Sequence, residues 1–155
     1  MMSALRHHRH FPGTYEGAGT AATWLHEVAG AERLLDNLVF ALEICLEELF
    51  TNVVRHGAPG RGPDGEPVPL SVDVAIELAG KHVDLVVSDN GKRFDTERAV
   101  PHPVHGTLDE TKPGGLGIQL IRSFSSDLHY ELLPTGNRVI VKFLRQEAAE
   151  AKAGA

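Results

Sequence analysis

A run of apolar residues at three- and four-residue steps, over residues 31–55, limits the folds open to this chain. It predicts one long helix, from about Ala31 to Arg55, with a face that must be buried against another layer. The apolar positions on that face are Leu35, Leu38, Val39, Leu42, Cys45, Leu46, Leu49 and Val53. The segment His56-Gly57-Ala58-Pro59-Gly60 ends the helix, because glycine and proline are typical of helix C-termini.

The segments around this helix supply the second layer. Alternating apolar positions predict strands, two antiparallel hairpins among them, and a Gly- and Pro-rich loop spans residues 60–69. In chain order we expect an edge strand at 5–11, helices at 18–28 and 31–55, strands at 70–78 and 82–88, a long loop at 92–113, a helix at 117–124, and strands at 128–133 and 138–144. The second hairpin would turn through Pro134-Thr135-Gly136-Asn137. This order predicts an α+β fold: a two-layer sandwich of a mixed, mostly antiparallel sheet with helices on one face.

Composition narrows the function classes. The chain has 155 residues and a formal net charge of −6, which argues against a nucleic-acid surface. We expect a single domain over residues 1–145 and a frayed or disordered tail over 146–155. No apolar run reaches the length of a membrane span, and the single cysteine, Cys45, fits a reducing cytoplasm. Because Cys45 lies in the apolar helical stretch, we predict a small core residue rather than a nucleophile.

Three segments carry chemistry, and the first is a polar row on the long helix. Glu48, Asn52 and His56 are four residues apart, so they project from one helical face. A carboxylate can take a proton from a hydroxyl, and an amide oxygen can ligate a hard cation such as magnesium. A solvated helix face would show the same pattern. Glu47 is a decoy, since it points to another side of the helix.

The second segment is Asp89-Asn90-Gly91, directly after an apolar strand. A carboxylate at a strand end can accept a hydrogen bond from an exocyclic amine, and the glycine lets a planar ring approach the backbone. A plain turn is the alternative, because this tripeptide is strong turn chemistry.

The third segment, residues 111–118, ends the long loop and opens the following helix. Backbone amides freed by glycine at a helix N-terminus form a phosphate site, and Lys112 could add a positive charge. The residues assigned to this site are Lys112, Gly114, Gly115, Leu116 and Gly117. The ordinary P-loop is absent, because no Gly-Lys-Ser/Thr follows.

In order and spacing, the three segments resemble the N, G1 and G2 boxes of the Bergerat-fold ATPases, the superfamily of gyrase and the histidine kinases. Within that superfamily the chain is most similar to the anti-sigma-factor serine kinases. The motifs that carry the resemblance are ELFTNVVRHG at 48–57, DNG at 89–91 and GGLGIQLIR at 114–122. The resemblance covers residues 5–145.

The resemblance implies a role for each matching position. Glu48 would be the general base, and Asn52 the ligand of a magnesium ion that bridges to the phosphates of ATP. Asp89 would accept the adenine amino group, and Gly91 would let the ring approach. The backbone amides of Gly115 and Gly117 would hold the phosphates.

The chain also departs from the family pattern. Arg93 stands where the G1 box usually has a second glycine, which leaves nucleotide affinity open. The last hairpin, which often carries a threonine near the adenine, has Gly136-Asn137-Arg138 instead, so that contact has no assigned residue.

The resemblance implies a homodimeric, cytoplasmic serine kinase that phosphorylates a STAS-type anti-sigma-factor antagonist and otherwise sequesters a sigma factor. Two other functions stay open: a catalytically inactive module that binds nucleotide and a partner, and a regulator of a target other than a sigma factor. Glu48 favours the kinase, since an inactive module has no need of a base.

Two further features invite functional interpretations. The N-terminal histidines, His7, His8 and His10, suggest a metal site, but no carboxylate or cysteine completes one. We therefore predict solvated side chains or an interaction surface, and solvent exposure for His102 and His105 as well. Trp24 is predicted to be a core or interface anchor.

Overall fold

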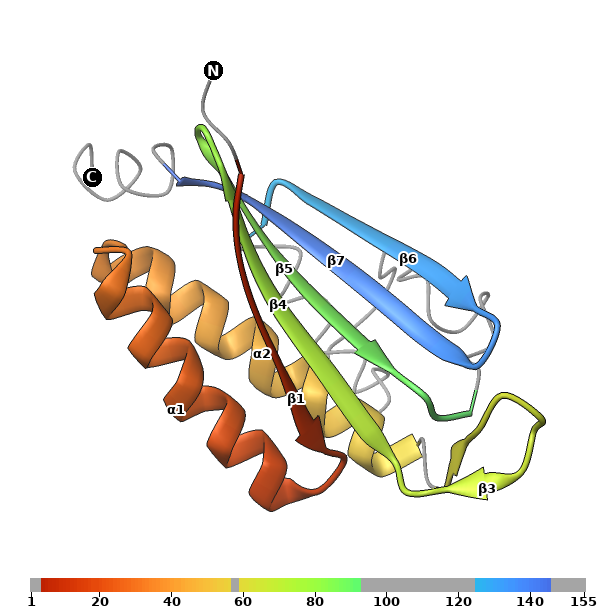
Figure 1. Cartoon of the computed structure of the whole chain (residues 1–155). Helices are drawn as coiled ribbons and strands as arrows, with labels where there is room; N and C mark the ends of the chain where they lie inside the picture. Colours follow the sequence, from red (N-terminus) through yellow and green to blue (C-terminus); the bar gives the residue numbers. More distant parts are fainter. Residues whose placement is uncertain (1–3, 57–58, 93–124, 146–155) are drawn as a thin grey trace, which may run out of the picture.

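In the described part of the computed structural model of the protein, two helices cover one face of a five-stranded sheet (Figure 1). The structure describes residues 4–56, 59–92 and 125–145. The sheet consists of β1 (Leu5–Pro12), β4 (Ser71–Ala79), β5 (His82–Asp89), β7 (Gly136–Leu144) and β6 (Asp127–Leu133), in that spatial order. All four pairings are antiparallel. The predicted two-layer α+β sandwich is confirmed.

The helices α1 (Tyr15–Ala31) and α2 (Asp36–His56) make the second layer. Leu38, Leu42, Leu46 and Phe50 follow one another at four-residue steps along α2 and are almost completely buried. They meet the sheet face formed by alternate residues such as Ile76 and Leu85, which are fully buried as well. The apolar residues that recur along the predicted helix therefore form the contact between the two layers.

Trp24 belongs to this core. It is 8% exposed, and its ring meets Phe11 edge-on, with the ring centroids 5.8 Å apart. Cys45 is fully buried, as predicted.

The helix boundaries differ from the prediction. The helix α1 begins at Tyr15, three residues before Ala18, because the side chain of Thr14 caps it by accepting a hydrogen bond from the Gly17 amide. It passes Val28, the predicted end, and ends at Ala31. Arg33 then adopts a left-handed backbone conformation, with φ of 53°. The long helix α2 accordingly starts at Asp36, not at Ala31.

Two predicted loops contain strands. Residues 60–69 hold a two-stranded ribbon, β2 (Gly60–Arg61) with β3 (Pro67–Val68). The Arg61 amide donates to the Asn90 carbonyl and the Gly62 amide to the Glu66 carbonyl, and these bonds leave no alternating apolar pattern in the sequence. Gly136 and Asn137 were predicted as turn residues, but they open β7 and pair with Leu133 and Leu132 of β6. Leu70, predicted as a strand residue, precedes β4.

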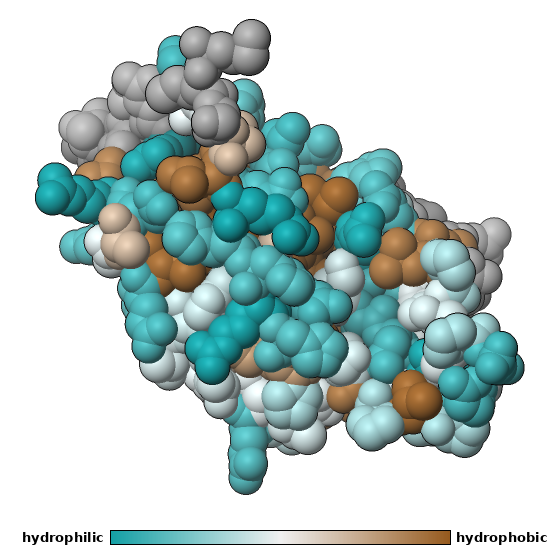
Figure 2. All heavy atoms as spheres, viewed as in Figure 1, coloured by the Kyte–Doolittle hydropathy of each residue, from teal (hydrophilic) through white to brown (hydrophobic). Residues whose placement is uncertain are grey.

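The surface on the side shown in Figure 2 is mostly hydrophilic, with apolar side chains in separate small patches. The exposed large apolar side chains are scattered: Leu5, Tyr15, Phe40 and Leu132 lie on four different elements, and Leu35 precedes α2. None of the helices in the described part of the chain is long and apolar enough to cross a membrane.

Several predicted features lie outside the described residues. They are the loop from residue 93 to 113 with His102 and His105, the helix 117–124, and the tail 146–155.

Candidate functional site

The polar row on α2 runs along one side of the helix, next to its buried face. Glu48 and Asn52 are half-buried, whereas His56, the last residue of the helix, is exposed. Glu47, the neighbour of Glu48, is exposed to solvent. The row therefore places a carboxylate and an amide at the edge of the core, with an imidazole beyond them in solvent.

The side-chain oxygen of Asn52 is buried and has no hydrogen-bond partner among the described residues. Buried polar atoms in folded proteins nearly always have a partner, and an orphan oxygen calls for an explanation. An amide oxygen is a good ligand for a hard cation such as Mg²⁺. Asn52 Oδ1 therefore fits the position of a metal ligand.

Asp89 lies at the end of β5 and is only 7% exposed. Its Oδ1 accepts hydrogen bonds from the Gly91 amide, at 2.8 Å, and from Asn137 Nδ2, at 3.1 Å. Burial raises the pKa of this carboxyl above its ordinary value, and the two hydrogen bonds oppose that rise. Oδ2 takes part in neither bond, so within residues 4–56, 59–92 and 125–145 one acceptor atom of this carboxylate is open to a ligand.

The ends of α2 and β5 bring the two segments to the same end of the molecule. Both elements run toward the lower right of Figure 1, and α2 packs against β5. The structure thus gathers the half-buried carboxylate of Glu48, the amide oxygen of Asn52 and the buried carboxylate of Asp89 on one side of the sheet.

Asn90 has a structural role that the sequence did not reveal. Its Oδ1 accepts a hydrogen bond from the Ser71 amide, at 2.8 Å, and its Nδ2 donates to the Pro69 carbonyl, at 3.1 Å. Its own carbonyl accepts from the Arg61 amide, at 2.6 Å. Asn90 therefore ties the chain around the β2–β3 ribbon to the end of β5, next to Asp89.

Asn137 is the other polar residue that sequence reasoning missed. It is fully buried and stands opposite Asp89 in the register of β5 and β7. The Tyr130 hydroxyl donates to its Oδ1 at 2.5 Å. The only signal in the sequence was its place in the last hairpin, where it was predicted as part of a turn.

The predicted phosphate segment lies outside the described residues. This holds for Lys112, Gly114, Gly115, Leu116 and Gly117, and also for Arg93. The structure therefore brings together two of the three predicted segments.

Cys45 shares α2 with this site but is no nucleophile candidate. Burial, and then the nearby charge of Glu48, raise the pKa of its thiol to about 12. The thiolate, which is the reactive form, is therefore strongly disfavoured at neutral pH.

The N-terminal histidines meet carboxylates from other elements, which the sequence did not indicate, while His8 and His10 are exposed, as predicted. Asp73 Oδ1 on β4 lies 3.3 Å from His8 Nε2 and 2.7 Å from His10 Nδ1. On the other face of β1, His7 Nε2 lies 2.8 Å from Glu32 Oε2. These contacts join distant parts of the chain, so the sequence could not show them. In the described ranges, no three His, Cys, Asp or Glu side chains have a metal-binding arrangement.

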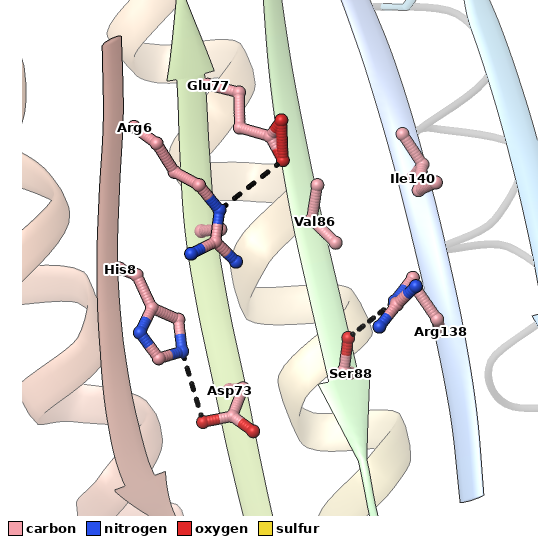
Figure 3. A pocket seen from close by; sticks show the side chains of 9 residues that line it. Arg6, His8, Asp73, Glu77, Val86, Ser88, Arg138 and Ile140 are labelled. Carbon is pink, nitrogen blue, oxygen red and sulfur yellow. Dashed lines mark hydrogen bonds and ion pairs between the residues drawn. The ribbon is translucent and has the colours of Figure 1, made fainter. Parts of the chain in front are cut away.

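A shallow hollow lies on the sheet face that the helices leave open (Figure 3). Its charged side chains are paired within it: Arg6 Nε lies 3.7 Å from Glu77 Oε1, and Arg138 Nε donates to Ser88 Oγ at 3.2 Å. Because these side chains alternate with the buried residues of the same strands, the hollow faces away from Asp89 and Asn52. It is separate from the candidate site.

Comparisons with known proteins agree with this geometry. The family model of the histidine kinase-like ATPase domain matches residues 11–143. A serine/threonine-protein kinase of Bordetella bronchiseptica, BtrW, is 31% identical over 115 residues, which are 74% of this chain and 76% of the relative. The serine-protein kinase RsbW of Bacillus pumilus is 26% identical over 144 residues, or 90% of this chain and 86% of the relative.

Solved structures share the fold. One contains the RsbU and RsbW domains of a Mycobacterium tuberculosis protein, and it matches with a TM-score of 0.61 and 17% identity. The match covers 90% of this chain but only 32% of that one. The histidine kinase domain of a blue-light activated kinase from Erythrobacter litoralis matches with a TM-score of 0.58 and 16% identity, over 92% of this chain and 65% of that one.

Proposed function

Since the chain belongs to the histidine kinase-like ATPase family, as a protein-serine/threonine kinase of the anti-sigma-factor kinase branch, we propose that it binds Mg²⁺ and ATP and phosphorylates a serine of a STAS-type anti-sigma-factor antagonist. In the same proposal it sequesters a sigma factor, acts in the cytoplasm and works as a homodimer. The relatives named as serine kinases support the reaction class. The partners rest on the family resemblance.

The observation that carries the proposal is the orphan oxygen of Asn52, one helical turn from Glu48. In the proposal, Asn52 Oδ1 holds the magnesium ion, which supplies positive charge beside the phosphates when it is bound. A buried acceptor without a partner costs the free protein stability. A cation ligand is a reason to keep it.

Glu48 is proposed as the general base, because its half-buried carboxylate lies on the same row as Asn52. It would take the proton from the substrate serine as the serine oxygen forms a bond to the γ-phosphorus. The bond between that phosphorus and the bridging oxygen breaks, and ADP leaves. The contribution of the protein is mainly position and charge.

Asp89 is proposed to recognise the base. Its Oδ2, which makes neither of the bonds to Gly91 and Asn137, would accept a hydrogen bond from the adenine amino group, while Gly91, which has no side chain, would let the ring approach the backbone. The phosphate contacts of residues 112–117 and the exposed His56 complete the proposed nucleotide site.

Transfer of labelled phosphate tests the proposal. The chain is incubated with γ-labelled ATP, magnesium and a STAS-type antagonist domain, and we expect label on a serine of that domain. Glu48→Gln should lose transfer by at least about 100-fold, the usual contribution of a general base, and should still bind ATP. Glu47→Gln, one residue away but exposed, is the matched control and should retain transfer.

Two results would count against this function. Nucleotide binding without any label on the antagonist would exclude the kinase reaction. Full transfer by Glu48→Gln would exclude Glu48 as the base. Light scattering of the purified chain tests the proposed homodimer directly.

A further inference from the structure

The buried amide of Asn137 connects the proposed base acceptor to the edge strand of the sheet. Its Nδ2 donates to Asp89 Oδ1 at 3.1 Å and to the Lys92 carbonyl at 2.9 Å. Its Oδ1 accepts from the hydroxyl of Tyr130 on β6, at 2.5 Å. Asp89, Asn137 and Tyr130 thus form a chain of hydrogen bonds across three strands.

The partners of Asn137 determine which way its amide points. A carbonyl and an ionised carboxylate can only accept, so they select the NH₂ end. The Tyr130 hydroxyl can donate, and it selects the oxygen end. If the amide were reversed, its oxygen would face the carboxylate oxygen of Asp89, and the two acceptors would have no hydrogen between them.

The backbone holds this arrangement in place. Gly136 has a φ of 131°, and a Cβ atom there would lie only 1.8 Å from the Asp89 carbonyl oxygen. Only glycine permits so close an approach of β7 to the end of β5. The next residue, Asn137, is thereby held directly opposite Asp89.

The Asn137 amide also favours the ionised form of the Asp89 carboxyl, which can only accept hydrogen bonds. Burial raises the pKa of Asp89, and the N–H groups of Gly91 and Asn137 lower it. Among the described residues, Glu48 on α2, Lys92 after β5 and Tyr130 on β6 are ionisable groups on neighbouring elements, and the shift is ascribed to burial, Gly91 and Asn137 rather than to them. The balance between the neutral and ionised carboxyl therefore depends on burial and on the hydrogen bonds that Gly91 and Asn137 donate.

We propose that Asn137 and Tyr130 are positioning residues of the base subsite, and that together they set a preference for a 6-amino purine over a 6-oxo purine. This inference rests on the proposed function, because it needs Asp89 to meet the base. An ionised carboxylate accepts from a 6-amino group and repels a 6-oxo oxygen. A neutral carboxyl can donate to that oxygen, so a loss of ionisation relaxes the preference.

The test compares the Kd values of ATP and ITP, which differ at the 6-position of the base, in the presence of magnesium. The parent chain should bind ATP more tightly. Tyr130→Phe removes only the hydroxyl, and we expect the ratio of the two Kd values to fall about three- to tenfold, the usual effect of one hydrogen bond. The chain has two tyrosines, and the exposed one gives the control: Tyr15→Phe should leave the ratio unchanged.

A pH profile separates positioning from simple loss of structure. ATP affinity should fall as pH drops through the pKa of Asp89, and in Asn137→Ser this midpoint should move to higher pH, because a donor to the carboxylate is gone. Suppose that the parent prefers ATP, that Tyr130→Phe leaves the ratio of the ATP and ITP Kd values unchanged, and that Asn137→Ser leaves the pH midpoint of ATP binding where it was. This combination would overturn the inference about Asn137 and Tyr130 and leave the proposed function standing. A parent chain that binds neither nucleotide would overturn the proposed function itself.

Discussion

Replacing Asn52 by leucine should stabilise the protein without nucleotide and abolish its response to ATP. The buried Oδ1 of Asn52 has no partner in the described part of the chain, and such an atom costs about 1–3 kcal/mol. Leucine has nearly the same size, lacks the oxygen and is the better helix former, by about 0.5 kcal/mol. The free energy of unfolding should therefore rise by about 1–3 kcal/mol, which for a domain of this length raises Tm by about 2–12 °C.

Urea unfolding in EDTA measures the first effect, and thermal unfolding with magnesium and ATP measures the second. At an ATP concentration about 100 times Kd, the parent should gain about 2.7 kcal/mol, and Asn52→Leu should gain nothing. Thr51→Leu is the matched control, since it changes helix propensity at the next position without removing an orphan atom. It loses the bonds from Thr51 Oγ1 to the Glu47 carbonyl, at 2.7 Å, and to the Glu48 carbonyl, at 3.4 Å, and should keep the ATP response.

Either of two results would refute this reasoning. If Asn52→Leu is less stable than the parent in EDTA, the oxygen has a partner in the free protein. If ATP still stabilises Asn52→Leu, the residue is not a ligand of the metal–nucleotide complex.

Three further predictions follow from buried groups and tight backbone contacts. Burial raises the pKa of Asp89, so ionising this carboxyl in the folded state costs stability as pH rises above the ordinary pKa of 3.8. In urea titrations, the stability gained by Asp89→Asn should therefore be small near pH 4 and larger at pH 7. The same variant should lose ATP binding. The Cys45 thiol, buried and with a pKa of about 12, should react with a disulfide reagent at pH 8 at least about 100-fold more slowly in the folded than in the unfolded chain; equal rates would contradict its burial. Gly136→Ala should lose about 3 kcal/mol or more, from the contact with the Asp89 carbonyl, whereas Gly80→Ala, at φ of 59° in open space, should lose only about 1–2 kcal/mol in the same denaturation assay.

Periodic features of the sequence predicted the fold well. The apolar steps along α2 and the alternation in β4 and β5 reflect burial on one face, which is a local pattern, and the structure confirms the layers that they imply. Boundaries were less accurate, because they depend on single events such as the Thr14 cap and the left-handed Arg33. Neither event changes the apolar period.

The candidate site was only partly predictable, and the reason is sequence separation. Glu48 and Asn52 share a helix, so their spacing alone placed them on one face. Asn137 and Asp89 are 48 positions apart, and they meet only because the register of β5 and β7 sets them opposite each other. A single sequence does not contain that register, so Asn137 was assigned to a turn.

Asn90 shows how a library of variants could be misinterpreted at this site. Its amide bridges Ser71 and Pro69, so aspartate would lose the donor and serine would lack the reach. In a selection for nucleotide binding, we expect this position to tolerate as few substitutions as Asp89 and Gly91 beside it. Low tolerance at Asn90 would then come from its support of the strand ends, and a map of intolerant positions would extend beyond the residues that touch the ligand.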